Sequence, residues 1–489
     1  MDELLKETMT LEEPYEVPEN WVWGKLGNLF TLKSGKSINK IEEQENGELA
    51  YIKVADMNLN ENQEEIRVAS KYVSSKIKYQ SSIIPPRSVI FPKRGGAILT
   101  NKKRLVMSEI LCDLNIMAVI SPKSICVKYL YYWFLTVDLA KLNNGSSVPQ
   151  INNKDINPLS FPLPPLNEQK RIAEKVELLL HKVDEAKQLI EEAKETFEIR
   201  RASILEKALR GEMTIDWRNN KSKVRSGETL LTIINEQREK IIQSLPKSRS
   251  RKNKIMEIRE DNVPFQIPPS WIWVRLGNIS TKIVDGAHHT PKYIDSGIPF
   301  LSVKDIKGNK INFDNTKFIS YEEHSELIKR CYPQKGDLLI TKSGTIGRTA
   351  VVDIDNEFSL FVSVALIKLA GLSINPRFIE YMIELLVNYD FGGEFVKGSA
   401  IKNLHLDQLI NLPIPLPSLE EQEKIVSILN KIFIRHNESI EILNGLNQKT
   451  ERLKQSILTK AFRGELGTND PAEENAIELL KEILQEQVK

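Results

Sequence analysis

One long segment occurs twice in this chain, and that duplication limits the possible folds more than any other feature. The first copy, residues 161–212, opens FPLPPLNEQKRI and ends SILEKALRGE. The second copy, residues 414–465, opens IPLPSLEEQEKI and ends SILTKAFRGE. Proline fixes φ and biases the residue before it toward extended geometry, so each opening excludes a helix. We therefore expect helices to begin near Asn167 and near Ser418.

The first copy predicts one long amphipathic helix. From Asn167 to Arg210 it would extend roughly 66 Å at about 1.5 Å per residue, and Gly211 is the expected stop. Its apolar residues alternate in steps of four and three, which is the spacing of a heptad seam. They are Ile172, Val176, Leu179, Val183, Ala186, Ile190, Ala193 and Phe197.

The second copy repeats this seam less regularly. Ser418 followed by Glu421 fits a capping box at its start. His436 and Ser439 interrupt the apolar spacing, and Gly445 costs about 1 kcal/mol relative to alanine in a helix interior. The apolar positions are Ile425, Leu429, Ile432, Leu443, Leu446 and Ile457. A helix with one apolar stripe needs a partner, so we expect the two copies to pair antiparallel; alternatively, each lies on its own globular domain.

The repeat extends over about 250 residues and covers the rest of the chain. VPENWVWGKLGNL at 17–29 returns as IPPSWIWVRLGNI at 267–279, and YIKVADM at 51–57 aligns with FLSVKDI at 300–306. SVIFPKRG at 88–95 aligns with DLLITKSG at 337–344, and Leu230, Leu231 and Ile234 match Leu479, Leu480 and Ile483. The predicted fold is α+β, with two repeated mixed α/β domains joined by two long helices packed as an antiparallel coiled coil.

This repeat predicts six segments. They are a globular domain at 1–166, a long helix at 167–213, a linker with a short helix at 214–265, a second globular domain at 266–417, a second long helix at 418–466 and a tail helix at 467–489.

Each globular domain is predicted to mix strands and helices. Residues 89–99 and 337–353 are typical of strand–turn–strand, with glycines in the turns. Residues 127–142 and 375–389 are typical of buried amphipathic helices, and we expect the aromatic run 131–134 to belong to the core rather than to a binding site.

The linker between the repeats combines a helix with a basic segment. Glu228–Gln243 predicts a helix, and it is followed by LPKSRSRKNK. That segment carries Lys247, Arg249, Arg251, Lys252 and Lys254 without an acidic residue. It is expected to be a solvated connector, or alternatively a tether for the DNA backbone.

Composition places the chain among ordinary cytoplasmic proteins. The three cysteines show no metal-binding spacing and no even framework, which favours a reducing compartment. Residues 1–20 lack the apolar core of a signal peptide, and no window has the 18 uninterrupted apolar residues that suggest a membrane span. The net charge of +2 neither requires nor excludes nucleic acid.

The usual catalytic motifs are not intact in the sequence. No Asn/Asp-Pro-Pro-aromatic motif of a DNA methyltransferase occurs, and FGGEF at 391–395 has the wrong spacing for its glycine motif. Gly35-Lys36-Ser37 resembles the end of a phosphate loop, but Phe30 stands where the first glycine belongs. His288 and His289 are adjacent, so they cannot share one helix face as metal ligands usually do. We expect no catalytic residue and no metal site.

Basic turns at matching places in the two repeats are the candidate binding sites. Lysine and arginine on rigid turns can hold phosphates, and arginine can read guanine edges bidentately. The polar loop 284–293 adds donors and acceptors of the base-reading type. The candidates are Lys93, Arg94, Asn101, Lys102, Lys103, Arg104, His288, His289, Thr290, Lys292, Lys342, Ser343, Thr345 and Arg348. The alternative for each turn is a solvated loop.

Together these motifs resemble the specificity (S) subunit of type I restriction–modification enzymes. The resemblance is carried by Pro-x-x-Trp-x-Trp-x-x-Leu-Gly at 18–27 and 268–277, by the two proline-rich helix openings, and by Leu-x-x-Ala-x-Arg-Gly-Glu at 205–212 and 458–465. It covers almost the whole chain, in duplicate.

The resemblance implies a non-catalytic DNA-binding subunit. Its two target-recognition domains would each read half of a split, asymmetric DNA sequence, and its paired helices would set the gap. Expected partners are double-stranded DNA, methyltransferase (M) subunits that bind S-adenosylmethionine, and restriction (R) subunits that use ATP and Mg²⁺, with no cofactor on this chain. The rival hypotheses are a degenerate single-chain modification enzyme or nuclease, and a scaffold that binds only proteins.

Overall fold

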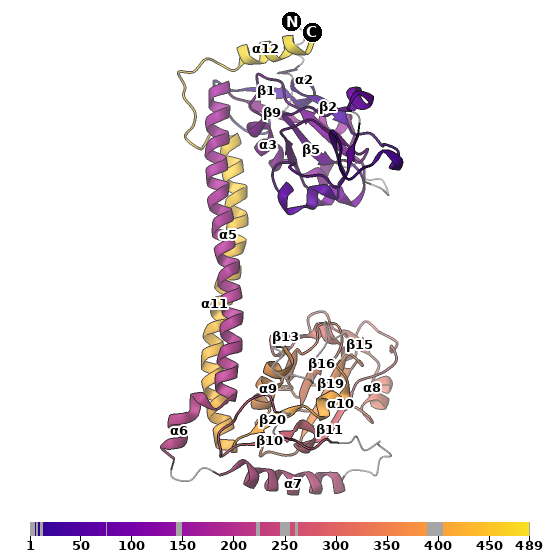
Figure 1. Cartoon of the computed structure of the whole chain (residues 1–489), viewed down its shortest axis with the longest axis vertical. Helices are drawn as coiled ribbons and strands as arrows, with labels where there is room; N and C mark the ends of the chain where they lie inside the picture. Colours follow the sequence, from indigo (N-terminus) through magenta and orange to yellow (C-terminus); the bar gives the residue numbers. More distant parts are fainter. Residues whose placement is uncertain are drawn as a thin grey trace. The chain divides into compact units, whose positions relative to one another are not determined.

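The computed structural model describes residues 5, 8–9, 13–74, 76–142, 149–221, 225–244, 255–259, 263–388 and 404–488. The chain divides into two compact units (Figure 1). Unit 1 comprises Met1–Glu191 and Asn444–Lys489, and unit 2 comprises Glu192–Leu443. Each unit therefore contains one globular domain and parts of both long helices.

In unit 1, the globular domain is built on two small sheets and a strand pair. The four-stranded antiparallel sheet has the order β2 (Thr31–Ser34), β8 (Ile116–Ile120), β5 (Ser88–Pro92) and β6 (Arg104–Val106). The three-stranded sheet has the order β4 (Tyr72–Val73), β3 (Leu49–Ile52) and β7 (Ile110–Cys112), and β3 pairs parallel with β7. The antiparallel pair is β1 (Val22–Lys25) and β9 (Ser160–Leu163). The helices are α2 (Leu26–Leu29), α3 (Val127–Thr136) and α4 (Asn153–Ile156).

Unit 2 repeats this topology and adds one small hairpin. Its four-stranded sheet has the order β11 (Ser280–Asp285), β19 (Val364–Leu369), β16 (Leu338–Thr341) and β17 (Thr349–Val351). Its three-stranded sheet has the order β15 (Lys317–Ile319), β12 (Ile298–Leu301) and β18 (Ser359–Leu360), with β12 parallel to β18. β10 (Ile272–Arg275) pairs with β20 (Pro413–Leu416), and a small hairpin joins β13 (Ile306–Lys307) to β14 (Lys310–Ile311). The helices are α6 (Ile215–Asn219), α7 (Gly227–Ser244), α8 (Tyr321–Leu327), α9 (Pro376–Asn388) and α10 (Leu406–Ile410).

The strand–turn–strand prediction is confirmed in unit 2 and only partly in unit 1. β16 and β17 form an antiparallel hairpin. In unit 1, Gly95–Thr100 forms a 3₁₀ helix instead of a strand, and the return strand β6 begins only at Arg104. The reason lies at the ends of that turn, where Gly95 (φ 72°) and Asn101 (φ 52°) adopt left-handed backbone conformations that an extended strand cannot contain.

The aromatic run on α3 belongs to the core, as predicted. Tyr131, Tyr132, Trp133 and Phe134 are all buried in the principal apolar cluster of unit 1. α9 is the matching helix of unit 2, and Phe378, Met382 and other apolar side chains on it are buried in the same way. In each unit this helix packs the four-stranded sheet into the main core.

Both long helices begin within one residue of the predicted starts, and the first ends just before its predicted stop at Gly211. α5 spans Leu166–Leu209 and α11 spans Leu419–Phe462, 44 residues each. Gly211 (φ 75°) and Gly464 (φ 73°) follow them in the left-handed conformation that ends many helices. At the start of α11 the Ser418 hydroxyl accepts from the amide of Glu421 at 3.3 Å, which is one arm of the expected capping box.

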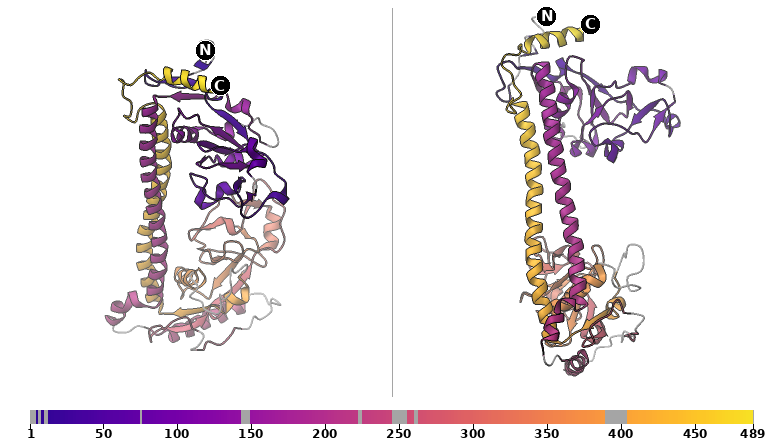
Figure 2. Two further views of the ribbon diagram at one scale, coloured as in Figure 1. Left: turned by 45° about the horizontal axis from the view of Figure 1, so that its top comes forward. Right: turned by 60° about the vertical axis from the view of Figure 1, so that its left-hand side comes forward.

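α5 and α11 pack antiparallel within each unit (Figure 2). In unit 1, Lys175 donates to the carbonyl of Leu466, and Lys187 pairs with Glu451 at 2.6 Å. The residue numbers rise along α5 while those of the contacting residues in and after α11 fall, as they do when two helices are antiparallel. In unit 2 the same order holds, because His436 contacts the carbonyl of Phe197 and Thr214 contacts Glu421. The predicted antiparallel coiled coil is confirmed.

Most seam positions are buried or half-buried, with one clear exception. On α5, Ile172, Val176, Val183 and Ile190 are buried, and on α11 so are Ile425, Leu429 and Ile457. The half-buried members are Leu179, Ala186, Ala193, Phe197, Ile432 and Leu443. Leu446 is 40% exposed, so its assignment to the seam is wrong. Alternating steps of four and three from Leu429 reach position 447, where Asn447 is half-buried, and leave Leu446 one residue outside the seam.

Each short helix that follows a long helix packs on the globular domain of the other repeat. α7, which follows α5, buries Leu230 and Ile234 in the core of unit 2. α12 (Ile477–Val488), which follows α11, packs in unit 1 over α2 and β1 (Figure 1). Among the described residues no helix is both long enough and apolar enough to cross a membrane.

The repeated Trp-x-Trp motifs attach the ends of the long helices to the globular domains. In unit 1 the Trp21 indole N–H donates to Glu168 of α5 at 2.7 Å, and a Cβ on Gly464 would come within 2.4 Å of Pro18. In unit 2 the Trp271 indole donates to Glu421 at 2.9 Å, and a Cβ on Gly211 would come within 2.6 Å of Pro268. Each motif therefore contacts the start of one long helix and the glycine that follows the end of the other.

Candidate nucleic-acid interface

A lysine lies at the same place in both units, at the side of the four-stranded sheet where β5 and β16 end; we call this side the lysine edge. Lys93 follows β5, and Lys342 follows β16. The amide of Lys93 donates to Asn115 and its carbonyl accepts from Ile151. Lys342 forms the equivalent bonds, because its amide donates to the carbonyl of Ser363 and its carbonyl accepts from the amide of Leu404. This shared backbone pattern establishes that the two lysines are structurally equivalent, as the alignment of 88–95 with 337–344 predicts.

A glycine directly after an outermost strand of the same sheet, β2 in unit 1 and β11 in unit 2, marks the same edge. A Cβ on Gly35 would lie 2.0 Å from the carbonyl oxygen of Asp113, and a Cβ on Gly286 would lie 2.0 Å from that of Leu360. Only glycine fits such a close backbone approach. The amides of Gly35 and Lys36 donate to backbone carbonyls. Two amides of Gly35-Lys36-Ser37 are thus engaged within the domain, unlike the amides of a phosphate loop, which point at the ligand.

The two lysines differ in the residue that holds them. Lys93 donates to the hydroxyl of Ser34 at 2.7 Å, and Lys342 bonds the carboxylate of Asp285. Burial and the neighbouring charge of Arg94 lower the pKa of Lys93. Burial alone would raise the pKa of Asp285, but the hydrogen bonds from Lys342 and His288 bring it below its ordinary value.

Asp285 is the centre of a polar cluster in unit 2. Its side chain is only 5% exposed, and it accepts from Lys342, from Arg330 at 2.5 Å and from His288 at 3.0 Å. Arg330 and His288 are themselves about half exposed. The cluster borders a cavity of about 300 Å³ whose lining includes His289, Leu327 and Leu360.

Lys103 and Arg104 do not belong to the exposed basic surface that the sequence predicts. Lys103 is 1% exposed, and its ammonium donates to the side chain of Asn101 and the carbonyl of Val137. Arg104 is also buried and donates to the carbonyls of Lys103 and Met57. Both side chains satisfy backbone groups beneath the turn, which corrects their assignment as DNA contacts. Arg87, with φ 65°, likewise donates to the carbonyl of Pro122.

The other candidates of unit 1 lie at or near the lysine edge. Arg94 is exposed, and its backbone forms an antiparallel bridge with Gln150. Lys102 is half-buried and bonds the side chain of Asn58. Asn101 accepts from both Lys103 and the amide of Leu139, so its side chain fixes the turn.

The remaining candidates of unit 2 divide between loop and hairpin. His289, Thr290 and Lys292 are exposed on the loop after β11, and His289 contacts Glu323 at 2.8 Å. On the β16–β17 turn, Thr345 is exposed and Ser343 is half-buried. Arg348 is half-buried too, with its amide bonded to Thr341. The basic segment 247–254 of the linker and the FGGEF sequence lie outside the described residues.

Sequence reasoning missed Ser34 and Arg330, because neither stands in a basic turn. Asp285 was within the polar loop but was not singled out. A signal was nevertheless present for two of them, since Ser34-Gly35 and Asp285-Gly286 are matching dipeptides before the close-approach glycines. Among the described residues no group of histidine, cysteine or carboxylate side chains is placed to hold a metal ion.

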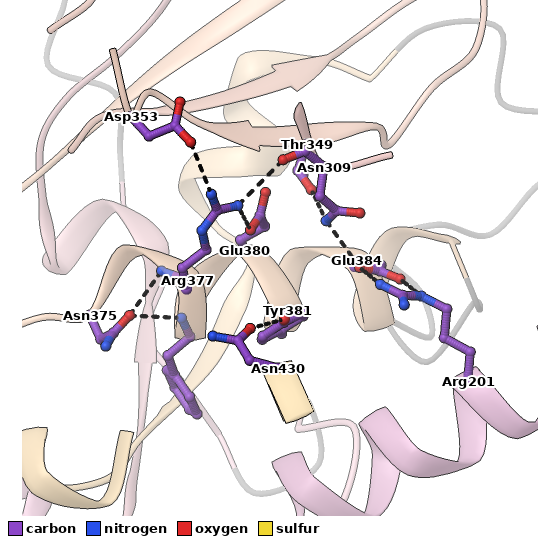
Figure 3. Close-up of polar contacts among 11 residues, drawn as sticks. Arg201, Asn309, Thr349, Asp353, Asn375, Arg377, Glu380, Tyr381, Glu384 and Asn430 are labelled. Carbon is purple, nitrogen blue, oxygen red and sulfur yellow. Dashed lines mark hydrogen bonds and ion pairs between the residues drawn. The ribbon is translucent and has the colours of Figure 1, made fainter. Parts of the chain in front are cut away.

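A second polar network in unit 2 joins the globular domain to both long helices (Figure 3). Arg201 of α5 forms a bidentate pair with Glu384 of α9, at 2.6 and 3.0 Å. Asn309 donates to the same carboxylate at 3.3 Å, and Tyr381 donates to Asn430 of α11 at 2.7 Å. The Arg201 and Asn430 contacts attach α9 to the coiled coil, and the Asn309 contact attaches it to the turn between β13 and β14.

The neighbouring turn of α9 carries a second buried carboxylate in this network (Figure 3). Arg377 pairs with Glu380 at 2.7 Å, and Glu380 is 1% exposed, so burial raises the pKa of its carboxyl. Asp353 adds a longer contact to Arg377, at 3.7 Å. The network is a structural junction rather than a binding surface.

Known proteins show where this architecture occurs. The chain is 28% identical over 345 residues to the type I restriction enzyme EcoBI specificity subunit of Escherichia coli, a match covering 69% of this chain and 66% of that subunit, just under two thirds. It is 23% identical over 467 residues to the EcoKI specificity subunit of Escherichia coli strain K12, covering 92% of this chain and 90% of that subunit.

A solved structure shares the fold. A chain from "Structural basis underlying complex assembly and conformational transition of the type I R-M system" matches with a TM-score of 0.63 at 21% identity, covering 93% of this chain and all of that one. The sequence profile of the family described as "Type I restriction modification DNA specificity domain" matches residues 18–195 and 271–452, one match in each repeat. Because these matches cover well over half of its length, the chain belongs to the family of type I restriction–modification DNA specificity proteins.

Proposed function

We propose that each globular domain reads one half of a split, asymmetric DNA target. The observation that carries this proposal is the pair of lysine edges: the same backbone presents Lys93 beside Ser34 in unit 1 and Lys342 beside Asp285 in unit 2. A shared backbone with different side chains is what two readers of different sequences need, because bases are distinguished by side-chain donors and acceptors in the groove.

The long helices serve as the spacer in this proposal. Each has 44 residues, roughly 66 Å at about 1.5 Å per residue. One turn of DNA is about 34–36 Å, so helices of this length suit half-sites one to two turns apart.

The chain itself is non-catalytic in this proposal and acts through partners. The EcoBI and EcoKI relatives are named as specificity subunits of restriction enzymes. By analogy, methyltransferase subunits would bind S-adenosylmethionine, and restriction subunits would use ATP with Mg²⁺. The coiled coil and its junctions with the globular domains would provide the scaffold for them.

Methylation mapping tests this function directly. The chain is co-expressed with a methyltransferase subunit in a host that lacks other modification systems, and methylated sites are sequenced genome-wide. A two-part motif with an unspecified gap is expected, and none without this chain. Methyl transfer by the purified chain alone would instead favour the rival single-chain enzyme.

A domain exchange separates the two halves. Replacing Pro18–Phe161 with the equivalent domain of a relative should change one half of the motif and leave the other unchanged. The graft keeps a proline at 18 and a tryptophan at 21, because these residues contact Gly464 and Glu168. A change in both halves would contradict independent reading.

A further inference from the structure

The buried carboxylate of Asp285 redistributes charge at the lysine edge of unit 2. In unit 1, Lys93 is bonded to a neutral hydroxyl, so its positive charge is uncompensated by that partner. In unit 2, Lys342 is bonded to Asp285, which compensates its charge, but Asp285 also holds Arg330. One carboxylate therefore faces two cations, Lys342 and Arg330, and cannot compensate both. Incompletely compensated positive charge is thus carried by Lys93 in unit 1 and is available on Arg330 in unit 2.

Arg330 stands on a rigid support. It lies in the turn that ends α8, and its amide donates to the carbonyl of Leu327. α8 is anchored by the fully buried His324, whose ring nitrogen lies 2.9 Å from the hydroxyl of Ser359 on β18. Ser320 caps the start of α8 by accepting from the amide of Glu323. A supported side chain loses little freedom when it binds, which favours specific contacts.

The guanidinium of Arg330 is held on one side and exposed on the other. Within the described part of the chain, its recorded contacts to Asp285 and His288 both involve Nη2. The side chain is 52% exposed and borders the cavity beside the loop after β11. Arginine has five N–H donors in a fixed fork, so a bond through one nitrogen leaves paired donors for a planar acceptor edge.

The acidic residues around this cavity are engaged by other side chains. Glu323 contacts His289, and Glu326 contacts Lys329 at 2.6 Å. The carboxylate that faces Arg330 is therefore Asp285, whose role is to orient the guanidinium.

We infer that Arg330, positioned by Asp285, reads a guanine edge in the second half-site through the N7 and O6 acceptors. This inference rests on the proposed function and assigns a specificity-determining residue to unit 2. A contact that served only to hold a phosphate would not need a buried carboxylate to fix the direction of the fork, because phosphate contacts position a protein without reading sequence.

The test compares variants co-expressed with the methyltransferase subunit. Arg330→Gln should relax one base position of the second half-site, reducing discrimination there by roughly 5- to 150-fold, the range of one good bidentate contact. Arg330→Lys keeps the charge but loses the fork, and should relax the same position. Asp285→Asn, which keeps the shape but removes the carboxylate charge, should relax that position as well. In all three variants the first half-site should be unchanged.

Matched controls separate reading from folding and charge. Lys329→Gln removes a neighbouring exposed cation and should leave the motif unchanged. Lys93→Gln should affect only the first half-site. Thermal unfolding of each purified variant shows whether unit 2 is intact, and Arg330→Lys covers the case in which Asp285→Asn unfolds it.

Two results would overturn the inference. An unchanged motif in Arg330→Gln would show that this residue does not read DNA. Uniformly weaker binding at all sequences, with the salt dependence reduced by about one counterion, would show a phosphate contact instead. Neither result touches the proposed function, which fails only if the wild-type chain directs no two-part motif.

Discussion

The ion pair between Arg201 and Glu384 offers a sharp test of how the second globular domain is attached to the coiled coil. Both side chains are largely buried, at 13% and 8% exposure, and the pair is bidentate. The Arg201 guanidinium also lies 3.9 Å from the ring centroid of Phe433 on α11. Arg201→Met would leave Glu384 buried without its charged partner. Removing one member of a buried pair costs about 3–5 kcal/mol.

The repeat supplies a natural control for this change. Asn375 bonds Gln422 as Cys126 bonds Gln169, so α9 aligns with α3 and Glu384 corresponds to Leu135. Unit 1 therefore carries an apolar residue, packed against its core, at the position of Glu384. The double variant Arg201→Met with Glu384→Leu should recover most of the loss, because replacing a buried ion pair by apolar groups is often neutral or stabilising.

Hydrogen exchange of the full-length chain is the appropriate assay, since a protein of two units need not unfold in one step. Peptides from α9 should exchange faster in Arg201→Met, by the factor that corresponds to 3–5 kcal/mol, and return close to wild type in the double variant. Peptides from α3 serve as an internal reference. A loss below about 1 kcal/mol in the single variant, or a double variant as unstable as the single one, would refute the reasoning.

Three further changes test other parts of the structure. Val183→Asp buries a charge in the seam and should destabilise unit 1 by roughly 2–5 kcal/mol in denaturant unfolding, whereas Leu189→Asp, at an exposed position, should cost little. Burial lowers the pKa of Lys103 from the ordinary 10.5 to about 7, so between these two pH values the unfolded chain binds more protons than the folded chain. The free energy of unfolding should therefore rise with pH across that range, by up to about 1.4 kcal/mol per pH unit. Lys103→Met should abolish this rise in melting experiments at different pH values. Inserting seven residues after Ala193 and after Leu443 keeps the heptad register and lengthens each helix by roughly 10 Å. Mapped methylation sites should then keep both half-sites and gain about three base pairs of gap, whereas two-residue insertions should prevent assembly. Altered half-site bases with an unchanged gap would count against the spacer role of the helices.

Local signals were sufficient to predict the two long helices of this protein. Proline-rich openings and the glycines at 211 and 464 set the ends of two 44-residue helices, because φ restriction and left-handed conformations act within a few residues. The heptad spacing predicted a helical partner, and the internal repeat predicted two copies of one fold. Those predictions depend on patterns that are read along the chain.

Packing decided what the side chains do. Lys103 belongs to a basic turn in the sequence, but its ammonium points inward to the carbonyl of Val137. Leu446 is apolar, but the seam passes through Asn447 beside it. Whether a side chain is buried depends on its direction relative to a neighbouring element, and composition does not contain that direction.

The same distinction holds for the candidate interface. The sequence by itself identified Lys93 and Lys342 as equivalent, because both stand in aligned strand-turn segments. Only the tertiary structure brought Asp285 and Arg330 together, from the end of β11 and the turn after α8, 45 residues apart. It also decided that α7 and α12 each pack on the globular domain of the other repeat. Such contacts form between segments distant in sequence, and they are selected by complementary shape and charge that exist only once both segments are folded.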